Sequence, residues 1–70
     1  MKRYNAKVEL HLTLAKLHQL ILADATLCGK LSDHACCLLD VAQSMGTITV
    51  GEYTALLAEV KTWNKEITHV

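Results

Sequence analysis

The chain has 70 residues, a mass of 7.7 kDa, and seven basic against seven acidic residues, so its formal net charge is zero. This length allows one small domain, and the balanced charge argues against binding nucleic acid or an anionic membrane through a basic field. Hydrophobic residues make up 51% of the chain, with twelve Leu and no Pro, which favours helices. We therefore expect an all-α fold in which residues 1–70 form a single small helical domain.

The first expected helix spans about residues 4–28 and has an apolar stripe with spacings of four, three and four residues. This main stripe consists of Leu10, Leu14, Leu17 and Ile21. Gly29 stands where a glycine commonly follows the last turn of a helix. Residues 7–14 also alternate between apolar and polar side chains with a period of two, so a strand over these residues is the alternative.

A second apolar stripe lies on the opposite side of this expected helix. It consists of Val8, Leu12, Ala15 and Leu22. A helix that is apolar on two faces must bury both of them, and two later helices would cover only one. The sequence therefore predicts self-association through one of the two stripes, and a two-fold dimer is the favoured assembly because that symmetry is the commonest.

The second expected helix spans about residues 32–45. Ser32 has a side chain that is favoured at an N-cap, and Asp33 would then lie in the first turn, near the positive end of the helix dipole. Gly46 follows in the position that favours glycine after a helix. The expected apolar face comprises Ala35, Leu38, Leu39, Ala42 and Met45.

The third expected helix spans about residues 50–67. Thr49 and Glu52 have the spacing of a capping box, in which each side chain accepts a hydrogen bond from the backbone N–H of the other residue. A short strand over residues 47–50 is the alternative. The expected apolar face comprises Tyr53, Leu56, Leu57, Val60, Trp63 and Ile67. We expect the second and third helices to form an antiparallel hairpin, with the long first helix packed on it.

Neither a catalytic nor a metal-binding arrangement is visible in the sequence. His34 and Cys37 are one helical turn apart, but no further ligand, oxyanion donor or paired carboxylate completes a site around them. We expect that the chain is not an enzyme and has no catalytic residues, no metal and no cofactor. Three cysteines in a helical context favour reduced, buried thiols and a cytoplasmic protein, and no segment has the apolar length of a signal peptide or membrane span.

The leading functional hypothesis is a small helical protein-interaction module that associates with itself and acts as a binder, inhibitor or modulator of a larger protein or complex. Its small size would suit a protein encoded by a phage or mobile element. Arg3, Tyr4 and Lys7 form a basic and aromatic cluster that could contact an anion or an acidic partner. An oligomer that sequesters a small anionic ligand through this cluster is one alternative.

A DNA-binding regulator is the other alternative. Residues 41–46 resemble the tight joint of a helix-turn-helix motif, in which Gly follows Ala by four residues. Thr47 and Glu52 depart from that pattern, which has apolar residues at the corresponding positions. The following helix carries no Lys or Arg before Lys61, and a carboxylate presented to the major groove is repelled by the phosphates, so these features argue against DNA as a partner.

Overall fold

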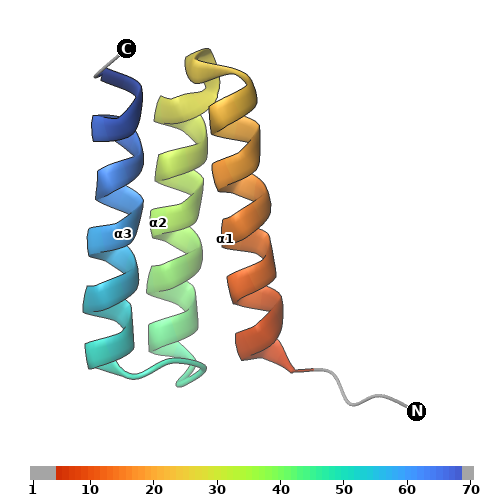
Figure 1. The fold of residues 1–70 in the computed structure, drawn as a ribbon. Coiled ribbons are helices and arrows are strands. Elements are labelled where there is room, and N and C mark those ends of the chain that lie inside the picture. The colour runs from red at the N-terminus through yellow and green to blue at the C-terminus, as the bar shows by residue number, and fades with distance from the viewer. Residues whose placement is uncertain (1–4, 69–70) are drawn as a thin grey trace.

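The computed structural model describes residues 5–68 and the side chains of residues 5–65. Within this part of the chain, three α-helices and a short 3-10 turn form, and there is no strand. The helices are α1 (Ala6–Ala23), α2 (Cys28–Ser44) and α3 (Val50–Thr68), and the 3-10 turn η1 (Ala25–Leu27) joins the first two. Figure 1 shows the helices side by side, each running opposite to the one before it. The prediction of an all-helical chain with three helices is confirmed, and residues 7–14 and 47–50 are not strands.

Asn5 caps the start of α1. Its side-chain Oδ1 accepts hydrogen bonds from the backbone N–H groups of Lys7, at 3.1 Å, and Val8, at 3.2 Å. These N–H groups belong to the first turn of the helix, where no intrahelical acceptor is present. Glu9 adds a negative charge near the positive end of the helix dipole. The first helix therefore begins at Ala6.

The first helix ends at Ala23, and the prediction that it continues to residue 28 is wrong. Asp24 adopts an extended conformation, and its carboxylate accepts hydrogen bonds from the N–H of Thr26, at 3.1 Å, and the hydroxyl of Thr26, at 2.7 Å. The Thr26 hydroxyl and backbone N–H lower the pKa of the Asp24 carboxyl. This local turn competes with helix continuation, because an Asp side chain that bonds two residues ahead replaces helical hydrogen bonds.

The early turn moves the start of the second helix to Cys28. Gly29 and Ser32 then lie inside α2, so the predicted roles of Gly29 as a helix terminator and Ser32 as an N-cap are wrong. Leu27 occupies the N-cap position without a side-chain hydrogen bond, and the Ser32 hydroxyl lies 3.7 Å from the Cys28 sulfur. Gly29 and Ser32 are residue types favoured at helix ends, but the Asp24 turn ends α1 before the chain reaches either of them.

The joint between α2 and α3 follows the predicted chemistry. Gly46 has a φ of +79°, a conformation that disfavours any side chain, and it ends α2. The N–H of Glu52 donates to Thr49 Oγ1 at 3.1 Å, and the N–H of Thr49 donates to Glu52 Oε1 at 3.0 Å. The predicted capping box is therefore confirmed. The Tyr53 hydroxyl also donates to Asp40 at 2.6 Å and ties the two helices together on their outer side.

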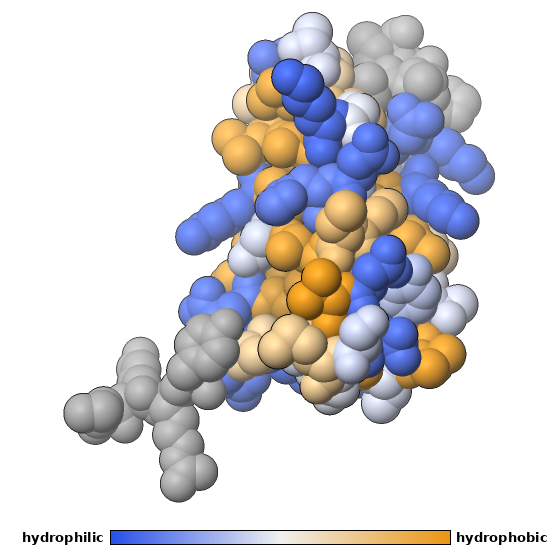
Figure 2. Space-filling model, turned by 180° about the vertical axis from the view of Figure 1, so that it is seen from behind, coloured by the Kyte–Doolittle hydropathy of each residue, from blue (hydrophilic) through white to orange (hydrophobic). Residues whose placement is uncertain are grey.

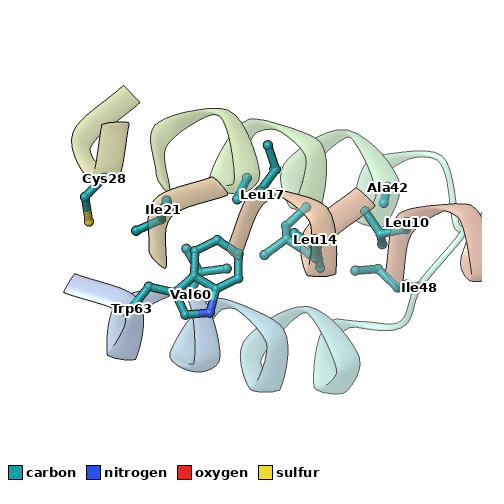
Figure 3. Close-up of a cluster of buried hydrophobic side chains, with 11 residues drawn as sticks. Leu10, Leu14, Leu17, Ile21, Cys28, Ala42, Ile48, Val60 and Trp63 are labelled. Carbon is teal, nitrogen blue, oxygen red and sulfur yellow. The ribbon is translucent and has the colours of Figure 1, made fainter. Parts of the chain in front are cut away.

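The core lies between the three helices, and α1 contributes its main stripe to it. Figure 3 shows these side chains in one cluster with Ile48, Val60 and Trp63. Ile21 and Leu39 are fully buried. Met45 is 76% exposed, so its predicted place on the buried face of the second helix is wrong. The buried set is Leu10, Leu14, Leu17, Ile21, Cys28, Ala35, Leu39, Ala42, Ile48, Val60 and Trp63.

Candidate interaction surface

The structure separates the two apolar stripes of α1. Leu10, Leu14, Leu17 and Ile21 pack inside the chain and are at most 8% exposed, so they are not available on the surface. The opposite side of the helix faces outward. Val8, Leu12 and Leu22 are 50%, 51% and 54% exposed. Of the two predicted interfaces, only the second stripe is accessible to another molecule.

This outward line of side chains has the spacing of a coiled-coil seam. Val8, Leu12, Ala15, Gln19 and Leu22, hereafter the outer stripe, follow one another at spacings of four, three, four and three residues. Ala15 is the smallest of the five and lies at the centre. A shallow hollow opens beside it, lined by Leu12, Ala15, Lys16, Gln19 and Leu20. The outer stripe therefore offers protruding side chains on both sides of a central depression.

Charged and imidazole side chains flank the outer stripe. At 100° per residue, Glu9 and Lys16 lie along one flank, and His11 and His18 lie along the other. Glu9 and Lys16 are exposed, and they are about 10 Å apart along the helix axis because two turns separate them. Neither has a residue of opposite charge three or four positions away. This flank of α1 (Figure 1) therefore presents one negatively charged and one positively charged side chain to solvent.

The other flank leads into a small pocket between α1 and α3. The rings of His18 and Trp63 are stacked with centroids 4.9 Å apart and planes 7° from parallel. His11 and Glu59 also line the pocket, whose volume is about 160 Å³. The buried Nε1 of Trp63 has no hydrogen-bond acceptor within the described part of the chain. The stacked rings of His18 and Trp63 therefore connect this flank of α1 to α3.

The Lys7 side chain is paired with an acidic side chain at the surface. Its ammonium group forms an ion pair with the Glu52 carboxylate, with Nζ and Oε2 2.5 Å apart. The Lys7 contact is the largest cause of a lowered pKa of the Glu52 carboxyl, and the Thr49 N–H adds to it. Arg3 and Tyr4, the other members of the predicted anion-binding cluster, lie outside the described residues. No spacing rule in the sequence pointed to the contact between Lys7 and Glu52, because these residues belong to different helices.

The three cysteine side chains differ in their burial. Cys28 is buried, Cys36 is half-buried and Cys37 is exposed, so the expectation of buried thiols is wrong for Cys37. His34 is also exposed on α2. Among the described residues, no group of three or more His, Cys, Asp or Glu side chains is placed to hold a metal ion. None of the helices in this described part of the chain has the length and apolarity needed to cross a membrane.

A second set of exposed apolar side chains lies around the joint between α2 and α3. Val41, Met45 and Val50 are 55%, 76% and 65% exposed. Figure 2 shows hydrophobic side chains interspersed with hydrophilic ones over the back of the molecule. The chain turns sharply between α2 and α3 at Gly46 and the capping box, so these three residues do not form a continuous line on one helix. The outer stripe of α1 remains the surface with a regular repeat.

The chain matches no protein-family model, and neither a curated protein nor a solved structure is significantly similar to it.

Proposed function

We propose that this chain is a small helical protein-interaction module that binds through the outer stripe of α1 and acts as a binder or modulator of the protein it covers. The observation that carries the proposal is the regular line of half-exposed apolar side chains on a helix whose opposite face is already buried. A surface helix normally has a polar outer side, because water solvates polar groups there at no cost.

Burial of this line would supply a useful binding free energy. Full burial of a Val or Leu side chain stabilises by about 1.5–3 kcal/mol, so covering the exposed half of one such side chain contributes on the order of 1 kcal/mol. Val8, Leu12 and Leu22 together would add several times that amount. The zero net charge of the chain is consistent with a partner recognised by apolar contact rather than by long-range attraction.

The helix is also placed to present the stripe without rearrangement. Asn5 caps its first turn, and the main stripe anchors it to the core, so the outer side chains are held on a preformed scaffold. Binding then costs little backbone entropy. We expect the partner to meet the outer stripe with a complementary apolar surface.

A site-specific photocrosslink tests this function. Leu12 is replaced by p-benzoylphenylalanine in one variant, and exposed Asp33 on α2 is replaced in a matched control. Both variants are irradiated in cells that produce them, after circular dichroism has shown that each retains its helices. We expect a discrete protein adduct from position 12 and none from position 33. The absence of an adduct at position 12, or equal adducts at both positions, would contradict the proposal.

A further inference from the structure

We infer that the occupant of the outer stripe is a second copy of this chain, with the two α1 helices packed antiparallel. This inference rests on the proposed function and names its partner. A seam with alternating spacings of four and three residues fits the surface of another helix, because knobs at this repeat enter the holes between the side chains of a facing helix. The chain itself carries such a helix, and a two-fold axis would let each copy bury the same side chains.

Side-chain size favours the antiparallel direction. In an antiparallel pair, Leu12 of each copy faces the partner's Ala15, so a large side chain enters the depression left by a small one, twice over. A parallel pair would instead place Ala15 opposite the partner's Ala15 and leave a gap at the centre. In the antiparallel register Val8 faces the partner's Gln19, away from the centre, where the amide can reach water.

Charge selects the register. With Leu12 opposite the partner's Ala15, Glu9 of each copy lies beside the partner's Lys16, which gives two ion pairs on the same side of the seam. A shift of one heptad in either direction would place Lys16 against the partner's Lys16, or Glu9 against the partner's Glu9. Both shifts bring like charges together. Glu9 and Lys16, which have no opposite charge one turn away, are therefore complementary to a second α1.

The molecule leaves room for this packing. α2 and α3 both pack on the side of α1 that carries the main stripe, and they contact each other more extensively than either contacts α1. The principal-axis extents of the chain are 41, 28 and 15 Å, so the three helices form a shallow layer with α1 at one side, as Figure 1 shows. A second helix can approach the outer stripe without meeting α2 or α3.

Charge exchange provides the experiment. Sedimentation equilibrium is measured for the full chain, for the variants Glu9→Lys and Lys16→Glu, and for the double variant, all under reducing conditions because Cys37 is exposed. The chain itself is expected to have twice the mass of 7.7 kDa. Each single variant replaces two attractions by two repulsions, and its dimer dissociation constant is expected to rise about tenfold. The double variant is expected to recover dimerisation.

Mixing the two single variants is the sharpest measurement. The Glu9→Lys chain carries a positive charge at both position 9 and position 16, whereas the Lys16→Glu chain carries a negative charge at both. Every contact between position 9 of one chain and position 16 of the other is then attractive, so the mixture is expected to form a heterodimer that neither variant matches alone. Lys30→Glu, which makes the same charge change as Lys16→Glu at an exposed site on α2, is expected to leave the dimer unchanged.

Three results would overturn the inference. The first is a monomeric chain, and the second is a dimer whose affinity does not respond to either charge change. The third is a mixture that associates no better than its components. A monomer whose position 12 still crosslinks to a different protein would remove the homodimer and leave the proposed function standing. A chain that neither dimerises nor crosslinks at position 12 would remove both.

Discussion

Lys7 in the first turn of α1 forms an ion pair with Glu52 in the first turn of α3, and the same Glu52 carboxylate accepts the Thr49 N–H of the capping box. The Glu52 carboxylate thus caps the start of α3 and also links it to the start of α1. Both side chains are partly exposed, so solvent screens the pair, and its effect is read most clearly through pH.

Acid is expected to remove the stabilisation provided by Glu52. The pKa of this carboxyl is lowered in the folded chain, so its contribution is present above the ordinary value of 4.5 and is lost as the pH falls through the folded pKa. Glu52→Gln keeps an acceptor for the cap and removes the charge. Urea unfolding of both chains is expected to show a stability difference at pH 7 that shrinks at pH 3. A difference that is independent of pH would contradict the role of the ion pair.

Removal of the Thr49 hydroxyl is expected to weaken the third helix. Thr49→Ala leaves the N–H of Glu52 without its acceptor, and loss of such a cap costs about 1 kcal/mol of unfolding free energy. Thr54→Ala is the control, because the Thr54 hydroxyl donates to the carbonyl of Val50 within its own helix and caps nothing. Urea denaturation of the two variants at pH 7 measures the difference. Equal midpoints would show that the capping box does not stabilise the fold.

The position of the turn between α1 and α2 can be tested by truncating the side chains of Asp24 and Ser32 separately. Asp24→Ala removes the acceptor for both Thr26 groups and is expected to lower the melting temperature. Ser32→Ala is expected to leave it nearly unchanged, because Ser32 lies inside α2 and is not its cap. Thermal unfolding followed by circular dichroism compares them. A larger loss for Ser32→Ala would instead support a second helix that begins at residue 32.

The two stripes of α1 are expected to respond differently to truncation. Ile21→Val removes one methylene group from a fully buried side chain and is expected to cost about 1 kcal/mol at any protein concentration. Leu12→Ala acts on a half-exposed side chain, and its cost is expected to be below about 0.5 kcal/mol for dilute chain. If the outer stripe dimerises, this cost grows with protein concentration. Denaturation at several concentrations would show whether only the second variant behaves in this way.

Trp63 is the only Trp in the chain, so its fluorescence reports directly on the stacked pair. His18→Ala removes the ring that covers one face of the indole, and the emission maximum is expected to shift to longer wavelength as water reaches it. His11→Ala is the matched control, because His11 lines the same pocket without stacking on Trp63. Spectra of the folded variants are compared under identical conditions. An equal shift for both variants would show that the stack does not shield the indole.

Local and periodic signals in the sequence predicted the helices themselves. The apolar repeat from Leu10 to Ile21 specified a helix, because a helix returns to the same face every three to four residues. Gly46 and the Thr49–Glu52 box specified the second joint, since their hydrogen bonds and backbone conformation involve only residues close together in the chain. The first joint was predicted wrongly because the Asp24 turn, Gly29 and Ser32 were competing local signals.

Tertiary structure alone decided which face of α1 is buried and which contacts join distant residues. Both stripes of α1 repeat every three to four residues, so periodicity alone does not choose between them, and the buried line is the one that packs with Ile48, Val60 and Trp63. The pairs of Lys7 with Glu52 and His18 with Trp63 each span two helices. Their formation depends on how α1 lies against α3, and no spacing within a single helix encodes that relation.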